Sequence, residues 1–235
     1  MSEIAALPYR RVFVNTGDPI EETDLVEFRL LYSGELLAAS REDTRAAHKH
    51  EIRRTFHPQL RRLWNLENNL RKLAQLYWGR SLKGKKNYAI PSEQEIFEQG
   101  IRSFSENWGR NGFKFVPLVT DEMALRCSLD ILLLRPQEKR FIFTQGDIDG
   151  QVKTLFDALR IPKNFAEAGG IGPQQDETPF FCLLEDDRLV TEVRVLADQL
   201  LLLPSQRDCK ATDSFVIIDV KLNHRNPRTR DNYFG

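Results

Sequence analysis

Cysteine is scarce in this chain, which has only three in 235 residues. Cys127, Cys182 and Cys209 are widely spaced and odd in number, and none belongs to a C-x-x-C pair. This usage argues against a disulfide framework and against a zinc knuckle. We therefore expect a reducing, intracellular environment.

Long apolar runs are also missing. No stretch is long enough to cross a bilayer, and no N-terminal segment combines a basic flank with the apolar run of a signal peptide. The sequence therefore predicts a soluble, cytoplasmic protein with no membrane partner.

A net charge of one sign is absent too, because 34 Lys and Arg balance 34 Asp and Glu. The charges are nevertheless sorted along the chain. Residues 1–40 carry three basic and seven acidic side chains, a balance of −4, whereas residues 41–86 carry thirteen basic and four acidic, a balance of +9. Sorted charge creates a directed electrostatic field, so the basic segment is the natural place to look for an anionic partner.

An apolar content of 41% is enough to bury a substantial core, and we expect one domain over residues 1–235. In the first half, residues 25–32 predict a strand that ends at Ser33-Gly34. Apolar residues then recur every three or four positions, and we expect two helices there, interrupted near Pro58. Ser92 stands three residues before Glu95, a capping box that predicts a third helix ending near residue 107.

The second half alternates strands with one helix. Residues 112–120 and 124–134 predict two strands joined by a short connection, and residues 139–145 another. A helix follows from about residue 149 to 159, then a loop over 163–179, and then further strands containing the runs FFCLL, RLVTEVRVLADQ and SFVIIDVKL. These elements predict an α/β chain of the α+β type, a mixed sheet flanked by helices, with extra helices in the basic region 41–110.

Carboxylates crowd the start of the helix predicted near residue 149. Asp149, Lys153 and Asp157 are spaced by four residues and so share one helical face, and Asp147 precedes them. One interpretation is an aspartate N-cap beside an Asp–Lys pair. The other is a metal site, because a divalent cation relieves the repulsion between neighbouring carboxylates.

A second acidic cluster, Glu185, Asp186 and Asp187, falls on the connection between two predicted strands. Taken alone, it is consistent with an ordinary acidic turn. With the first cluster, it forms the order D-x-D-x-x-x-K, then D-A-L, then D-D-x-x-V.

This order resembles the RusA family of Holliday-junction resolvases over roughly residues 124–222. The matching segments are Asp147-Ile-Asp149, Lys153, Asp157-Ala158-Leu159 and Asp186-Asp187-Arg188-Leu189-Val190. The resemblance implies a homodimeric, metal-dependent endonuclease that hydrolyses phosphodiester bonds in branched DNA. It implies Asp147, Asp149 and Asp187 as ligands of Mg²⁺, or of Mn²⁺, and as catalytic residues together with Lys153, a charge-stabilising partner or proton handler.

Two departures from the family support a second hypothesis. Gly150 stands where the family usually has asparagine, and the segment 163–179 lengthens the path between the two acidic clusters. The alternative is a RusA-like nucleic-acid-binding accessory protein that is catalytically weak or inactive.

Arginines follow the apolar stripe of the first predicted helical region. We place Arg53, Arg54, Arg61 and Arg62 together opposite that stripe, with Lys83, Lys85 and Lys86 nearby in sequence. Such a face is either simply solvated or a phosphate-contacting surface that sets orientation rather than sequence preference.

The histidines near residue 50 and the glycine run near residue 170 both have structural interpretations. His48, His50 and His57 have no acidic or cysteine partner that completes a metal set, so we expect solvated or core histidines. The run Gly169-Gly170-Ile171-Gly172 lacks the strand and helix of a nucleotide-binding fingerprint and predicts a flexible loop.

Overall fold

The structure is a computed structural model that describes residues 27–39, 45–81, 91–136, 148–201, 210 and 212–224. Several predictions fall outside these ranges and are not tested. They are the strand expected over 139–145, the first motif carboxylate Asp147, and the basic residues Lys83, Lys85 and Lys86.

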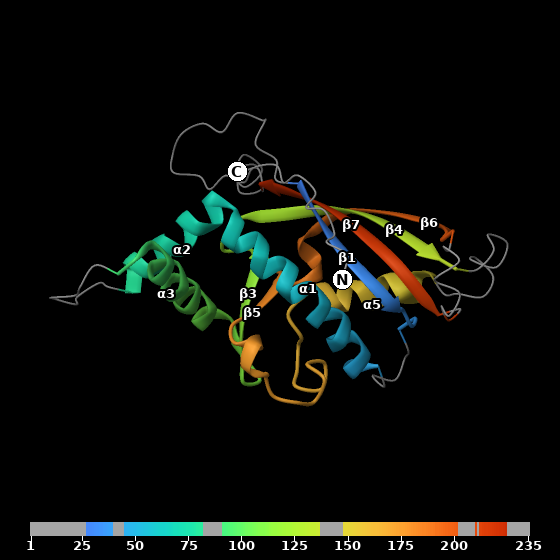
Figure 1. Ribbon diagram of the computed structural model, residues 1–235, viewed down its shortest axis with the longest axis horizontal. Coiled ribbons are helices and arrows are strands. Elements are labelled where there is room, and N and C mark those ends of the chain that lie inside the picture. Colours follow the sequence, from blue (N-terminus) through green and yellow to red (C-terminus); the bar gives the residue numbers. More distant parts are fainter. Residues whose placement is uncertain are drawn as a thin grey trace, which may run out of the picture.

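The predicted α+β class is confirmed, with helices lying against two sheets (Figure 1). The larger sheet has four strands in the order β1-β7-β4-β6, where β1 is Glu27–Glu35, β7 Asp213–His224, β4 Leu125–Arg135 and β6 Val190–Gln199. Strand β7 is antiparallel to both β1 and β4, whereas β6 is parallel to β4. The smaller sheet pairs β2 (Gly109–Arg110) with β3 (Phe113–Val119), and β3 in parallel with β5 (Phe180–Leu184).

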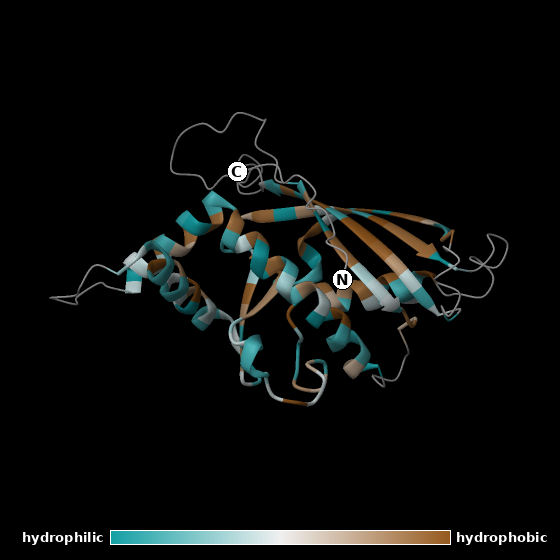
Figure 2. Ribbon diagram, viewed as in Figure 1, coloured by the Kyte–Doolittle hydropathy of each residue, from teal (hydrophilic) through white to brown (hydrophobic). Residues whose placement is uncertain are grey.

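One face of the larger sheet forms the core. On β4, Cys127, Leu129, Ile131 and Leu133 are buried while the residues between them are partly exposed. This confirms the alternation predicted from the sequence, and Figure 2 shows the hydrophobic colouring concentrated along these central strands. Alternation arises because successive side chains of a strand point to opposite faces, and the helices of the described part of the chain cover one of these faces.

The two helices expected over this apolar run are present, but the break predicted near Pro58 is not found. Helix α1 runs from Ala46 to Leu66 through Pro58, and the break comes at Glu67, before α2 (Asn68–Ser81). The predicted position of the break was wrong because an unbroken buried face extends across the proline, which is itself exposed. Continuous packing offsets the hydrogen bond that proline cannot donate.

Helix α3 (Glu93–Ser105) begins with the predicted capping box. The Ser92 hydroxyl accepts from the backbone N–H of Glu95, and the Glu95 carboxylate accepts from the backbone N–H of Ser92. A 3₁₀ turn, η1 (Glu106–Trp108), follows and continues into β2. Helices α2 and α3 cross where Gly100 meets the backbone of Ala74.

The strands expected over 112–120 and 124–134 are present as β3 and β4, but they lie in different sheets. The chain turns sharply between them, where Leu125 donates its N–H to the Thr120 carbonyl and Ala124 adopts a positive φ of 52°. This turn directs the chain from the small sheet into the large one.

Helix α5 (Ile148–Leu159) lies against the core face of the large sheet (Figure 1). The Gln151 amide donates to the Leu36 carbonyl and the Thr154 hydroxyl to the Leu37 carbonyl, both in the segment after β1. The chain then passes through residues 160–179, where the expected loop contains a 3₁₀ turn, η2 (Gln175–Glu177). Strand β5 and a last 3₁₀ turn, η3 (Asp187–Leu189), lead into β6.

No helix within the described part of the chain is long and apolar enough to cross a membrane.

Candidate functional site

The start of α5 presents two of the predicted site residues to solvent. Asp149 lies in the first helical turn, and Lys153 follows one turn later, and both are exposed. A carboxylate in the first turn is stabilised by the partial positive charge of the helix N-terminus. The two side chains therefore form an open, charged surface at this end of the helix.

The second acidic cluster is held in place by arginines and backbone groups. Asp186 caps η3 by accepting from the N–H of Arg188, and Glu185 accepts from the N–H of Asp121. Asp187 is exposed and lies 3.9 Å from Nε of Arg160. Asp187 is thus anchored near the residue that directly follows the C-terminus of α5.

Asp149 and Asp187 lie at opposite ends of α5. Asp149 is in the first turn, whereas the Arg160 that Asp187 approaches is eleven residues further on. At a rise of 1.5 Å per residue, this separation is about 16 Å along the helix axis.

The pairing of the large sheet independently indicates that Asp149 and Asp187 are far apart. Gln151, near the start of α5, is hydrogen-bonded to Arg135 at the C-terminal end of β4. Val190, just after η3, pairs with Cys127 near the N-terminal end of β4. Eight residues of strand separate these two positions, or about 26 Å at 3.3 Å per residue.

The prediction that Asp149 and Asp187 of one chain share a metal ion is therefore wrong. Ligand oxygens of Mg²⁺ lie at about 2.0–2.1 Å from the ion, so two of them must be within about 4 Å of each other. Within the described ranges, no group of three or more His, Cys, Asp and Glu side chains is arranged to hold a metal ion. The cause is the βαβ path, in which the helix carries the chain from one end of the sheet to the other.

Asp157 lies on the same helix as Asp149 and Lys153, as the spacing predicts, but it does not join their exposed surface. Its carboxylate is buried between Lys49, whose Nζ lies at 2.9 Å, and Arg160, whose Nη2 lies at 2.8 Å. Burial alone would raise the pKa of Asp157, but the hydrogen bond from Lys49 and the charge of Arg160 outweigh it and hold the pKa below its ordinary value. Asp157 is thus ionised and structural.

Arg160 continues this buried charge network into the loop that follows α5. Its Nη1 lies 3.0 Å from the Glu167 carboxylate, which also accepts from the N–H of Lys163. Burial tends to raise the pKa of Glu167, whereas the hydrogen bond from Arg160 lowers it, and the net shift is downward. The loop over 163–169 is therefore tied to the end of α5 by a buried salt bridge.

Arg53 was expected on the phosphate-contacting face, but its side chain is 1% exposed. Its guanidinium donates to three backbone carbonyls: Asp157 at 2.6 Å, Glu167 at 3.1 Å and Arg160 at 3.3 Å. Burial lowers the pKa of Arg53 to about 10, so the group stays charged at neutral pH. Arg53 satisfies carbonyls at the C-terminus of α5 and takes no part in binding a ligand at the surface.

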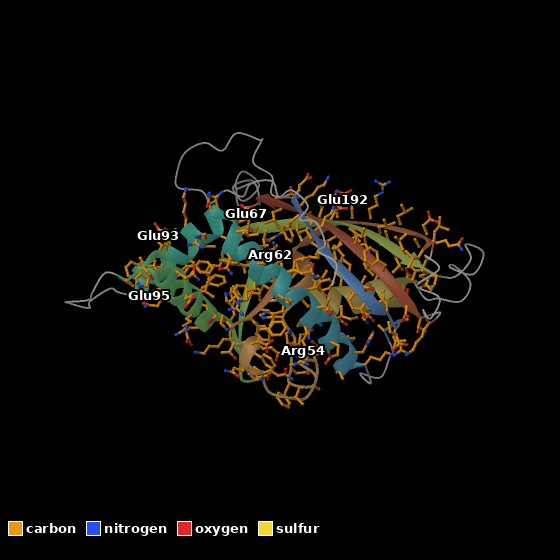
Figure 3. The ribbon with its side chains drawn as sticks, viewed as in Figure 1. Arg54, Arg62, Glu67, Glu93, Glu95 and Glu192 are labelled. Carbon is orange, nitrogen blue, oxygen red and sulfur yellow. The ribbon has the colours of Figure 1, made fainter. Side chains whose placement is uncertain are left out.

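The remaining arginines of the predicted basic face differ among themselves. Arg54 forms ion pairs with the buried Glu177 and with Glu51, 3.1 Å away, and is half-buried. Arg61 and Arg62 are exposed, and Figure 3 shows Arg54 and Arg62 along the same helix, α1. The basic surface that the described residues retain from the prediction is therefore Arg61 and Arg62.

His50 and His57 are core residues, which agrees with the expectation of solvated or core histidines. His50 and His57 are buried against Phe180, with ring centroids 5.9 and 4.5 Å away. Burial lowers the pKa of both, to about 4 for His50. His48 is half-buried, and its Nε2 accepts from the N–H of Leu37. All three imidazoles therefore pack and accept hydrogen bonds within the fold.

Comparison with known proteins gives no relative. No family model matches the chain, no curated protein matches it, and no solved structure matches it.

Proposed function

We propose that this protein is a metal-dependent, structure-selective DNA endonuclease that acts on branched DNA as a homodimer inside the cell. The proposal is supported by the order of the motif residues together with one structural observation. Asp149, Lys153 and Asp187 are all exposed, whereas Asp157 of the same motifs is buried. Residues that bind an ion and a phosphate have to be reachable from solvent, and these three are.

A site that uses both Asp149 and Asp187 has to be built from two chains, because the two residues lie at opposite ends of α5 in each chain. In the proposed site, Asp149 of one chain, with Asp147 before it, and Asp187 of a second chain hold Mg²⁺ or Mn²⁺. The bound cation supplies an activated water and neutralises charge on the leaving oxygen. Lys153, one turn after Asp149, stabilises the developing negative charge of the phosphate.

The direct test is incubation of the pure protein with four-way junctions and with linear duplex in magnesium. We expect cleavage of the junction that Asp149→Asn and Asp187→Asn each abolish. Thr191→Ser, an exposed neighbour on β6, serves as the matched control and should cleave normally. Absence of junction cleavage by the unmodified protein at any magnesium or manganese concentration would refute the proposal.

Mixing the two inactive variants tests whether the site is shared. A mixed dimer of Asp149→Asn and Asp187→Asn chains contains one intact pair if the pair spans two chains, and none if it lies within one chain. We therefore expect up to one quarter of the unmodified activity, because half of the dimers are mixed and each has one of two sites. No recovery after verified subunit exchange would exclude the shared site.

The separation of Asp149 from Asp187 favours a second candidate, a nucleic-acid-binding accessory protein without hydrolytic activity. This candidate predicts salt-dependent junction binding in the presence of a chelator and no nicking with any divalent metal. The same cleavage assay therefore decides between the two functions.

A further inference from the structure

Strand β6 is an edge strand of the large sheet as far as the described residues show. Its ten residues, Val190–Gln199, pair with β4 on one side, and among the described residues no strand pairs with the other side. Figure 1 shows β6 at the outer border of the sheet. An unpaired edge presents a row of free backbone donors and acceptors that another strand can use.

The side chains of β6 are unusual for an exposed edge. Leu196 is 56% exposed, Val193 42% and Val195 37%. Val193 and Val195 lie on one face of the strand, and Leu196 lies on the other face with Glu192, Arg194 and Asp198. The strand contains neither lysine nor proline, the residues with which proteins commonly protect an edge. Such a strand is suited to pairing with another chain.

Only part of β6 is regular. Cys127 of β4 pairs with Val190 but Ser128 pairs with Glu192, so the register shifts by one residue at Thr191. From Glu192 to Gln199 the pairing with β4 is unbroken. A partner strand that needs a regular backbone would therefore pair with this second part of β6.

Charge decides how β6 can pair with a copy of itself. A two-fold axis perpendicular to the sheet sets one residue opposite its own copy. Centring on Arg194 would oppose two arginines, and centring on Val195 would oppose Glu192 with Asp198. Like charges directly opposite each other destabilise a pair of strands, so both registers are disfavoured.

Two registers place opposite charges together, those centred on Val193 and on Leu196. The first pairs Glu192 with Arg194 but extends into the irregular part of the strand at Thr191. The second pairs Arg194 with Asp198 twice, sets Leu196 against its own copy, and stays within the regular part. The register centred on Leu196 is therefore favoured both by backbone regularity and by burial of the most exposed apolar residue of the strand.

We propose that β6 is a homodimer interface, in which two copies of the chain pair their β6 strands in antiparallel fashion about Leu196. The two four-stranded sheets then form one continuous sheet of eight strands. Glu192, labelled in Figure 3 near the β6 edge, lies at the border of this interface. Antiparallel pairing also points the Asp187 end of each sheet toward the Asp149 end of the other, which, on the proposed function, is the exchange that a shared acidic site requires.

Cysteine cross-linking tests the pairing and its register without reference to activity. Opposed residues of an antiparallel pair have Cα atoms about 4.5–5.5 Å apart, within the range a disulfide spans. Leu196→Cys, with Cys209 replaced by serine, should give a disulfide-linked dimer on mild oxidation, since Cys127 and Cys182 are buried. Val193→Cys is the matched control, because its own copy would lie six residues away, about 20 Å.

Cross-linking of Val193→Cys in preference to Leu196→Cys would overturn the proposed register, and linking at neither position would overturn the interface. Mass measurement in solution provides a second readout. We expect a dimer of twice 27.3 kDa for the unmodified protein and a folded monomer for Leu196→Lys. A monomeric unmodified protein at tens of micromolar, or an unchanged dimer for Leu196→Lys, would contradict the proposal.

A charge exchange identifies the partner of Arg194. Arg194→Asp alone should weaken the dimer, because it opposes two aspartates at each end. The double variant with Asp198→Arg should restore it, because the opposite charges have only exchanged places. Equal dissociation constants for the single and double variants would exclude the Arg194–Asp198 pairing.

Discussion

Nδ1 of His57 accepts a hydrogen bond from the backbone N–H of Phe181 over 2.8 Å, while Nε2 lies 3.1 Å from the Asp176 carbonyl. An acceptor role requires Nδ1 to be without a proton, so Nε2 carries the hydrogen and donates it. The imidazole is therefore neutral and of one tautomer, and it ties α1 to the first residues of β5. Protonation of Nδ1 would break this tie.

This arrangement predicts a loss of stability in mild acid. Burial lowers the pKa of His57 and of His50 in the fold, so the unfolded chain binds their protons first. The stability they contribute is fully present above about pH 6.5 and declines as the pH falls below it, by up to about 1.4 kcal/mol per pH unit for each histidine. Urea unfolding between pH 7.5 and 5 measures this slope.

His57→Gln supplies the control, because glutamine can accept and donate in a similar geometry but does not titrate. The variant should show a shallower loss of stability over the same pH range. Aspartates and glutamates contribute only at lower pH, since their ordinary pKa values lie near 4. An identical slope in the variant would show that His57 is not the titrating group.

Arg53 and Arg61 of α1 predict opposite effects on stability. Arg53→Met leaves three buried carbonyls without their donor and should destabilise the fold by about 3 kcal/mol or more. Arg61→Met, at an exposed position of the same helix, should change stability by less than about 0.5 kcal/mol. Denaturant unfolding of both variants makes the comparison, and similar values for the two would contradict the buried role of Arg53.

Two glycines provide a second matched pair. A Cβ at Gly100 would lie 1.9 Å from the Ala74 carbonyl oxygen, so Gly100→Ala forces α2 and α3 apart and should cost about 1–3 kcal/mol. A Cβ at Gly79 in α2 would meet nothing within 4 Å, and Gly79→Ala should add up to about 1 kcal/mol through helix propensity. Thermal unfolding should thus show a lower Tm for the first variant and an equal or higher Tm for the second.

Arg61 and Arg62 are the predicted phosphate contacts that the structure leaves exposed. Replacing both with alanine should weaken DNA binding and reduce the slope of log affinity against log salt by about 2 on duplex arms. Arg102→Ala, at an exposed position of α3, is the control and should leave the slope unchanged. A full slope in the double variant would remove α1 from the DNA-binding surface.

Local patterns predicted the elements well, because local interactions decide them. The alternation on β4 and the Ser92–Glu95 capping box depend on neighbours a few residues away, and both are found in the structure. The break predicted at Pro58 is absent because burial along the whole of α1 outweighs one missing hydrogen bond. That balance depends on tertiary packing, which a single proline does not reveal.

The sequence contains a signal that Arg53 is buried, so the prediction of a phosphate-contacting Arg53 was avoidable. Arg53 lies three residues after His50 and three before Phe56, so it falls within the buried stripe of α1 and not opposite it. Its carbonyl partners lie more than 100 residues away and are not visible in the helical period. Charged side chains usually face solvent, but the spacing along α1 is the better guide to the position of Arg53.

The order of the motifs predicts that the two acidic clusters lie together. Motif order does not, however, indicate in which direction the chain runs between them. In a strand, helix and parallel strand path the chain reverses before the helix and again after it, so residues before and after the helix lie at opposite ends of it. The predicted alternation of elements contained this fact, but only the parallel pairing of β4 with β6 makes it certain.

The hydrogen bonds of Arg53 determine whether the chain can be shortened to the part that carries the acidic motifs. Its guanidinium lies in the basic helical part of the sequence, and all its carbonyl acceptors belong to the stretch that carries the acidic motifs. Strand β1 also pairs with β7 along its whole length. A shortened protein spanning only residues 124–222 would lose both supports at once, so we expect it to aggregate or remain unfolded instead of forming a minimal enzyme.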